Sequence, residues 1–237
     1  MYGDRYVRLN RGLSLEFRAL LAAADWDLAL LQEVPPRWAG PLGEATGADH
    51  RRTLTSRNWM RPLTALPARR RPHLVGSWEG GSNLLLVRKG RPGTKVLEHR
   101  SAVLCRRPER RVVSMVRMEG GLCVANLHAS TGVERAARDV RRAAGLVHDW
   151  AGASPLVLGG DFNLRPSGSP VFGELRRTYG LDGVTDEGAI DHLLIRGAER
   201  IDPGSAWPDG RRDVPDRDAE LMVRLSDHAP VVSRISA

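Results

Sequence analysis

Five polar clusters border short apolar runs in this sequence and carry most of its chemically capable side chains. Three clusters end a run and two open one; the segments are 27–33, 121–128, 155–161, 191–195 and 226–232. Such runs are typical of buried strands. Because the end of one strand and the start of an antiparallel neighbour lie at the same edge of a sheet, all five clusters are expected to converge on one rim.

The segment 159–163 (Gly-Gly-Asp-Phe-Asn) places a carboxylate and an amide two residues apart. Side chains alternate along a strand, so Asp161 and Asn163 are expected on one face and Phe162 on the other. The two glycines leave room for another group to approach the backbone closely. The pattern therefore indicates a pair that holds water and phosphate. A turn-forming Asp and Asn at a strand end is the competing interpretation.

Two Asp-His steps, Asp191-His192 and Asp227-His228, each open an apolar strand. A carboxylate bonded to an imidazole fixes its tautomer and raises its basicity, which suits a general base. Packing alone is a poor explanation for two such steps. Strand alternation also pairs Asn126 with His128 on one face of the preceding strand.

Glu33, Asp227 and Asn10 form an oxygen-only set of candidate metal ligands, and no Cys or multi-His cluster accompanies them. Oxygen donors suit a hard cation, here Mg²⁺ with Mn²⁺ as an alternative, rather than zinc. Mg²⁺ takes one or two carboxylates and keeps waters for a substrate phosphate, which indicates phosphoryl chemistry. Taken alone, Glu33 is typical of a solvated carboxylate at a strand end.

Five motifs in order give the chain a resemblance to the endonuclease/exonuclease/phosphatase superfamily, whose fold is similar to that of deoxyribonuclease I. They span nearly the whole chain and are Leu31-Gln32-Glu33-Val34, Asn126-Leu127-His128, Gly159-Gly160-Asp161-Phe162-Asn163, Ile190-Asp191-His192 and Ser226-Asp227-His228-Ala229-Pro230. The resemblance implies a four-layered α/β sandwich: two packed mixed β-sheets flanked by helices, with the active site at one rim.

The resemblance also implies roles for individual residues. Glu33 would be the principal metal ligand, assisted by Asp227 and by Asn10. Asp161 would orient or deprotonate the attacking water, and Asn163 would hold a nonbridging phosphate oxygen.

The remaining implied roles concern the histidines and their partners. His228 would act at the scissile phosphate as base or electrophile, oriented by Asp191. Asn126 and His128 would contact the phosphate, with His128 a candidate acid for the leaving oxygen. Which group is the acid and which the base stays open at this point.

The elements expected to position these residues alternate along the chain. Apolar residues at helical spacing predict helices over 13–24 and 134–150, with a weaker one over 170–179. Further strands are expected over 83–87, 102–106, 111–118 and 122–126. The stretches 35–78 and 198–221 lack a clear period and are predicted as long surface excursions.

Composition is that of a globular protein: 237 residues, 41% apolar and 27% charged. We expect a single domain over 1–237, a monomer, and a cytoplasmic location, because no apolar run reaches bilayer length and the start lacks a secretion signal. Cys105 and Cys123 lie among apolar residues and are predicted to be buried thiols. The net charge of +8 would attract polyanions, although only two of the 36 basic residues are lysines, a pattern that GC-rich codon usage also produces.

The favoured function is a metal-dependent phosphodiesterase that uses an activated water, with a nuclease as the first choice and nucleic acid as substrate. A phosphatase or a sphingomyelinase-like enzyme, acting on a phosphorylated small molecule or a phospholipid, is the alternative. A non-catalytic nucleic-acid-binding module is the third hypothesis. Arginine runs at 69–71, 106–107 and 110–111 suit either a nucleic-acid backbone or solvated loops.

Overall fold

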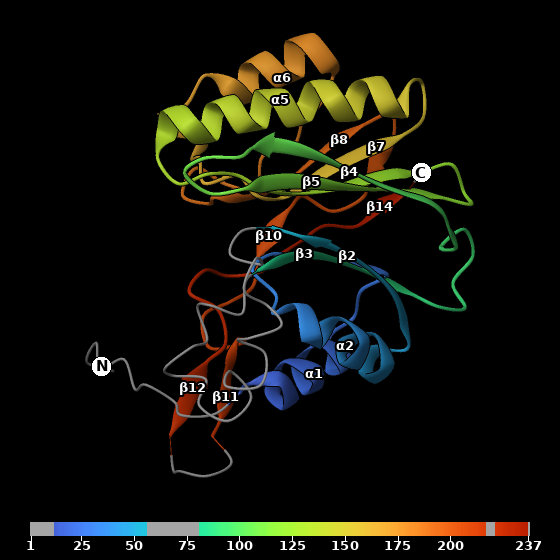
Figure 1. Ribbon diagram of the computed structural model, residues 1–237, viewed down its shortest axis with the longest axis vertical. Helices are drawn as coiled ribbons and strands as arrows, with labels where there is room; N and C mark the ends of the chain where they lie inside the picture. The colour runs from blue at the N-terminus through green and yellow to red at the C-terminus, as the bar shows by residue number, and fades with distance from the viewer. Residues whose placement is uncertain (1–11, 56–80, 217–220, 237) are drawn as a thin grey trace.

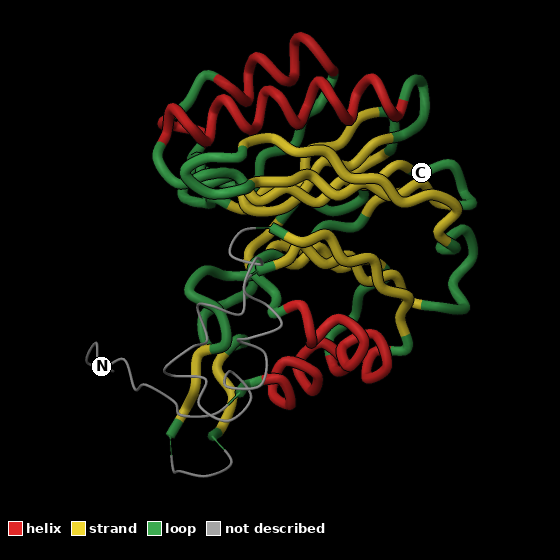
Figure 2. The backbone as a smooth tube through the Cα atoms, in the orientation of Figure 1, coloured by secondary structure: helices red, strands yellow, loops and turns green. Residues whose placement is uncertain are grey.

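The computed structural model of the protein describes residues 12–55, 81–216 and 221–236. Two β-sheets face each other, and a pair of helices covers the outer face of each (Figures 1 and 2). The order of layers is α5 and α6, a five-stranded sheet, a three-stranded sheet, then α1 and α2. The four-layered α/β sandwich expected from the sequence is confirmed.

The five-stranded sheet has the order β4-β5-β6-β7-β8. Its strands are β4 (Val96–Cys105), β5 (Arg111–Met118), β6 (Cys123–His128), β7 (Leu156–Asp161) and β8 (Asp191–Arg196). β6 and β7 are parallel, and the other neighbours are antiparallel. A parallel pair needs a long crossover, which here contains α5 (Val133–Ala151).

Helix α5 is strongly amphipathic, as its sequence pattern predicts. It buries Ala136, Val140, Ala144 and Val147 against the sheet, while its arginines occupy the opposite side. Helix α6 (Val171–Tyr179) packs beside it and ends at Gly180, whose left-handed φ of 67° is favourable for glycine.

The three-stranded sheet has the order β1-β3-β2, and both of its strand pairs are antiparallel. The strands are β1 (Leu28–Leu31), β2 (Ala48–Leu54) and β3 (Ser82–Arg88). Its outer face packs against α1 (Ser14–Ala23) and α2 (Ala39–Thr46), which follows a 3₁₀ turn (Pro36–Trp38). Apolar side chains between the two sheets form a continuous inner core, among them Leu85, Val116, Val124, Val157 and Ile195.

The prediction of a surface excursion over 35–78 is wrong for its first part, which contains α2 and β2. Helix α2 holds two glycines and a proline in eight residues, so its helical period is weak. Strand β2 is an edge strand with charged residues on its exposed positions, so it lacks an apolar run. Residues 56–78 lie outside the described part of the chain.

The described residues of the segment 198–221 also contain more regular structure than predicted. Short antiparallel pairs join it to the C-terminal segment: β9 (Glu199–Arg200) with β14 (Ile235–Ser236), β10 (Ser205–Ala206) with β13 (Val231–Val232), and β11 (Asp213–Pro215) with β12 (Met222–Arg224). Strands of two or three residues are too short to show a period. This pairing holds residues 226–230 in place.

No helix in the described residues has the length and apolar character to span a bilayer. Both cysteines are free thiols; Cys123 is buried and Cys105 is partly exposed.

Candidate active site

Three ionisable side chains stand in register across neighbouring strands at one edge of the five-stranded sheet. His128 ends β6, Asp161 ends β7 and Asp191 opens β8, and each lies opposite its neighbour in the strand pairing. His128 Nε2 lies 3.5 Å from the Asp161 Oδ2. We call these three residues the rim row. The convergence predicted from strand ends is therefore observed for three of the five clusters.

Asp161 occupies the centre of the rim row and is buried. Burial, with the adjacent carboxylate of Asp191, raises its pKa to about 6. A hydrogen bond from the backbone N–H of Asn163, at 2.8 Å, works in the opposite direction. The carboxyl group is thus poised to exchange a proton near neutral pH.

A tight turn brings the side chains of Asn163 and Asp161 together; the alternation of side chains along a strand does not. The φ of Asn163 is +50°, so the strand has already ended, and its amide nitrogen lies 3.2 Å from Asp161 Oδ2 and 3.0 Å from the Ala129 carbonyl. The expected proximity of the two side chains is correct, but its cause is an Asx-type turn, which was the competing interpretation. Phe162 is fully buried, as expected.

His228 is joined to the rim row through a short hydrogen bond between its Nδ1 and Asp191 Oδ2. This bond and the charge of Asp191 raise the pKa of His228 to about 9, against the effect of partial burial. Its Nε2 lies 3.4 Å from Asp227 Oδ1, on a side chain that is 94% exposed. At neutral pH the imidazole carries its second proton.

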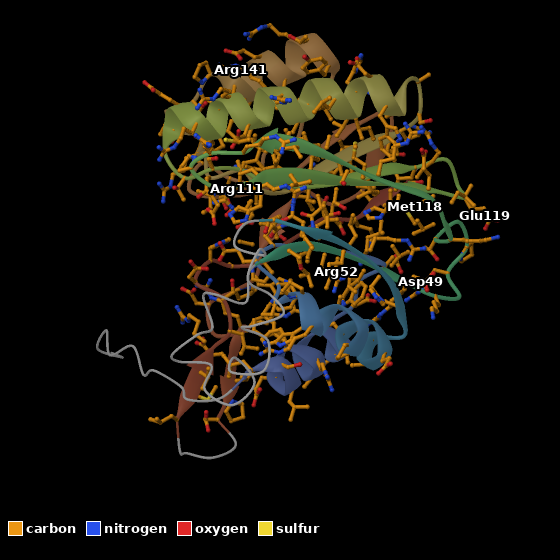
Figure 3. All side chains as sticks on the ribbon, viewed as in Figure 1. Asp49, Arg52, Arg111, Met118, Glu119 and Arg141 are labelled. Atoms are coloured by element: carbon orange, nitrogen blue, oxygen red, sulfur yellow. The ribbon has the colours of Figure 1, made fainter. Side chains whose placement is uncertain are left out.

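His128 is held in the opposite protonation state. Burial, together with the charges of Arg111 and His228, lowers its pKa to about 3. Arg111 Nη1 lies 2.9 and 3.0 Å from the two ring nitrogens, and Arg111 Nη2 is bound to Glu109 at 2.7 Å. Figure 3 shows Arg111 at one end of β5, with Met118 and Glu119 at the other end. A buried guanidinium therefore stands beside a neutral imidazole.

A cavity of about 1210 Å³ joins these groups. Its lining includes Glu33, Arg111, His128, Asp161, Asn163, Asp191, Asp227 and His228. Carboxylates, imidazoles, an amide and a guanidinium thus face one space, at the rim where the two sheets meet.

The model of the endonuclease/exonuclease/phosphatase family matches residues 4–228. The chain belongs to this family. Comparison with curated proteins gave no match.

Solved structures with the family fold cover most of the chain at low sequence identity. A mannosyl-6-phosphatase from Bacteroides thetaiotaomicron is 15% identical, with a TM-score of 0.68 over 95% of this chain and 92% of that one. An endonuclease/exonuclease/phosphatase from Beutenbergia cavernae is 20% identical, with a TM-score of 0.63 over 94% and 66%. TDP2 from Caenorhabditis elegans is 16% identical, with a TM-score of 0.61 over 95% and 70%. These likenesses show the fold.

Within this family member, Asn126 lies away from the cavity, contrary to the predicted phosphate contact. Its side chain is fully buried between the sheets. The amide nitrogen donates to the carbonyls of Leu31 and Leu84 at 3.0 and 3.1 Å, and Oδ1 accepts from Gln32 Nε2 at 2.7 Å. Both ends of the amide are committed to joining β6 to the other sheet, so Asn126 is a structural residue.

His192 likewise differs from the catalytic interpretation of its Asp-His step. It is 1% exposed, packs edge-on against Phe162 and Phe172, and lies 3.1 Å from the Leu164 carbonyl through Nε2. Burial lowers its pKa. Adjacent strand residues point to opposite faces, so Asp191 pairs with His228 while His192 enters the core.

The two glycines before Asp161 do allow other groups to lie close to the backbone, but these groups belong to the protein itself and not to a ligand. A Cβ on Gly160, which has a φ of +127°, would lie 2.0 Å from the Leu127 carbonyl oxygen. A Cβ on Gly159 would lie 2.5 and 2.6 Å from side-chain atoms of Leu193 and Leu30. Glycine is therefore required here to seat β7 against its neighbours.

The candidate metal ligands are oxygen donors, the type that a hard cation prefers. Glu33 is exposed, has a left-handed φ of 56°, and forms no ion pair or hydrogen bond within the described residues. No group of three Asp, Glu, His or Cys side chains in the described ranges meets the geometry of a metal site. Glu33 and Asp227 line one cavity, and carboxylate oxygens are donors that suit Mg²⁺, which keeps several waters, better than zinc. Asp227 also accepts a hydrogen bond from the backbone N–H of His228 at 3.2 Å. Asn10 lies outside the described residues.

Arg111 lines the candidate site, whereas the sequence analysis interpreted the arginine run 110–111 as suited either to a nucleic-acid backbone or to a solvated loop. A recognisable signal was present, because Arg111 opens an otherwise apolar strand, as Asp191 does. Strand β5 runs antiparallel to β6, so its first residue lies near the last residue of β6.

Proposed function

We propose that this protein hydrolyses phosphodiester bonds with an activated water, and that its substrate is a nucleic acid. The observation that carries the proposal is that one cavity is lined by both a carboxylate that is ionised and an imidazole that is protonated near neutral pH. Asp161 has a pKa of about 6 and His228 a pKa of about 9, so near pH 7.5 one is a base and the other an acid. Hydrolysis of a phosphate ester needs both.

Asp161 is the proposed base. Its ionised carboxylate accepts a proton from the attacking water, whose oxygen forms the new bond to phosphorus. Asn163 holds the carboxylate through two hydrogen bonds, one from its backbone and one from its side chain. Asn163 also lines the cavity, and its side-chain oxygen is proposed to accept a hydrogen bond from the water.

His228 is the proposed acid. Its Nδ1–H is bound to Asp191, so Nε2–H is the proton available to the oxygen that leaves as the P–O bond breaks. The family resemblance implied His128 as the candidate acid and His228 as base or electrophile, and left the assignment of acid and base open. The lowered pKa of His128 favours His228, because a neutral imidazole is a poor proton donor.

Arg111 and His128 are proposed to stabilise charge on the nonbridging oxygens. Arg111 supplies a permanent positive charge in a buried setting, where its effect on a developing anion is strong. His128 presents a neutral ring beside it. The two residues thus act on the phosphate without exchanging protons with it.

Glu33 and Asp227 are the residues that would hold a divalent cation. When bound, Mg²⁺ or Mn²⁺ would supply Lewis-acid stabilisation of the phosphate. Both carboxylates border the cavity that also holds Asp161 and His228.

The net charge of +8 supports a polyanionic substrate over a small monoester. The mannosyl-6-phosphatase with this fold supports a phosphate monoester as the second candidate. A phospholipid diester is the third candidate substrate, and the test includes it.

The test is hydrolysis of single- and double-stranded DNA, RNA, a sugar phosphate and a sphingomyelin analogue, with Mg²⁺, Mn²⁺ or chelator. Asp161→Asn should lower kcat by about 10²–10⁴, the range for loss of a general base. Asp149→Asn, an exposed carboxylate on α5 across the sheet, is the matched control and should retain full activity. Metal-dependent turnover that survives Asp161→Asn, or no turnover on any substrate, would overturn the proposal.

A further inference from the structure

Two residues of the segment 198–221 flank the turn that carries His228. The backbone N–H of Trp207 donates to the Pro230 carbonyl at 2.8 Å, and the backbone N–H of Leu225 donates to the Arg212 carbonyl at 3.1 Å. Leu225 and Pro230 lie three and two residues from His228, so the backbone attachment points are within about 10 Å of it. Both Trp207 and Arg212 line the cavity of the candidate active site.

Both side chains carry a buried donor that lacks an acceptor. The Arg212 side chain is only 9% exposed, and its Nη1 has no hydrogen-bond partner in the described part of the chain. The Nε1–H of Trp207, a residue that is also 9% exposed, has none either. Buried donors are nearly always bonded in folded proteins. Trp207 and Arg212 both line the cavity, and a ligand that entered between them would supply the acceptor that each buried donor lacks.

The charge of Arg212 is poorly compensated by the acidic groups near it. Asp209 lies 3.9 Å away with a side chain that is 94% exposed. Asp213 is bound through both oxygens by Arg224, at 2.8 and 3.0 Å. A buried cation without a close partner is unfavourable unless an anion joins it. The missing group is therefore negatively charged.

The Trp207 ring is not available for stacking on both faces, because the Arg211 guanidinium lies 4.3 Å from its centroid. This contact fixes the ring and leaves the indole N–H as its polar contribution. Recognition through N–H donors and a positive charge suits an oxyanion more than an unpaired base.

We infer that Trp207 and Arg212 form a subsite for a second phosphate of the substrate, next to the phosphate that is hydrolysed. The inference rests on the proposed function and extends it, because it requires a substrate that carries a second phosphate near the one that is hydrolysed. Neighbouring phosphates of a nucleic-acid strand and the two phosphates of a small bisphosphate share this chemistry.

The kinetic test uses two chromogenic diesters that differ by one phosphate: thymidine 5′-(p-nitrophenyl phosphate) with and without a 3′-phosphate. The wild-type protein should prefer the 3′-phosphorylated ester in kcat/KM by about 10–100-fold, the range for a charge-assisted contact. Arg212→Gln should reduce this preference to near 1 while keeping turnover of the ester that has one phosphate. Arg138→Gln, an exposed arginine on α5, removes the same charge and should keep the preference.

A binding measurement separates failure of the subsite from failure of the proposed function. Calorimetry compares thymidine 3′,5′-bisphosphate with thymidine 5′-phosphate, and fructose 1,6-bisphosphate with fructose 6-phosphate, which distinguishes the two sources of a second phosphate. The wild type should bind a bisphosphate at least tenfold more tightly than its monophosphate, and Arg212→Gln should lose that difference.

Each outcome has a defined consequence. If the wild type cleaves both esters equally and binds bisphosphates no better, the subsite is refuted while hydrolysis stands. If it cleaves neither ester but binds bisphosphates through Arg212, the diesterase proposal fails and the subsite stands. Should Arg212→Gln not fold, Trp207→Phe keeps the ring and removes the donor. A preference reduced about threefold to tenfold then supports the subsite, and an unchanged one refutes it.

Discussion

Replacing Asn126 by alanine should destabilise the protein without removing a substrate contact. The change deletes three buried hydrogen bonds: two to the carbonyls of Leu31 and Leu84 and one from Gln32. At about 1 kcal/mol each, the expected loss in the free energy of unfolding is about 3 kcal/mol. For a chain of this size that corresponds to a fall in Tm of about 6–12 °C.

The assay is thermal or urea unfolding of the wild type, Asn126→Ala and Asn163→Ala, with activity measured at 15 °C, where each remains folded. Asn126→Ala should keep most of the wild-type kcat at that temperature. Asn163→Ala should lose activity with a smaller change in Tm, because its side chain contacts the base at the cavity.

An Asn126→Ala variant with unchanged Tm and strongly reduced kcat would refute this reasoning. It would mean that the amide contacts substrate and that its bonds between the sheets contribute little. Asn126→Asp gives a second test, since a carboxylate of the same shape would face two carbonyl oxygens and should destabilise at least as much.

Four further outcomes are expected. Gly160→Ala should lower the free energy of unfolding by about 3 kcal/mol or more in urea titrations, because its Cβ would collide with a carbonyl oxygen, whereas Gly168→Ala, which has open space, should not. His128→Gln should remove a pH dependence of stability, because the unfolded histidine binds a proton below pH 6.5 and the folded one only below about 3. Between pH 7.5 and 5, the free energy of unfolding of the wild type should therefore fall by about 2 kcal/mol more than that of the variant. The profile of kcat/KM should fall below about pH 6 as Asp161 is protonated and above about pH 9 as His228 is deprotonated; a profile flat across that range would contradict the acid and base assignments. Chelator should abolish turnover and Mg²⁺ restore it, and Glu33→Gln should raise the Mg²⁺ concentration needed for half-maximal rate; equal requirements would exclude Glu33 as a ligand.

The rim row could be predicted from the sequence because apolar strands with a polar residue at one end carry two pieces of information. The apolar run gives the strand, and the position of the polar residue gives the edge it reaches. His128, Asp161 and Asp191 were found in this way, and the structure places them in register. The family motifs supplied the pairing of Asp191 with His228, which lies 37 residues further along the chain.

Other features depend on contacts that a single strand or turn does not reveal. The role of Asn126 is set by Leu31 and Leu84 in the opposite sheet, and that of His192 by aromatic rings from a different helix and turn. In each case the residue type suits catalysis, but the contacts of the side chain in the folded protein make it part of the buried core. Strand β2 was missed for a related reason, since an edge strand needs few apolar side chains.

The short strand pairs that join 198–215 to 222–236 support one of the two groups assigned to proton transfer. The base Asp161 ends β7, where Gly159 and Gly160 leave no room for a Cβ, whereas the acid His228 lies on the turn at 226–230. The surroundings of the turn at 226–230 are instead held by ladders of two or three residues. Exchange of residues 198–215 between relatives should therefore change the surroundings of His228, and with them the phosphate esters that are accepted, while Asp161 at the end of β7 stays in place.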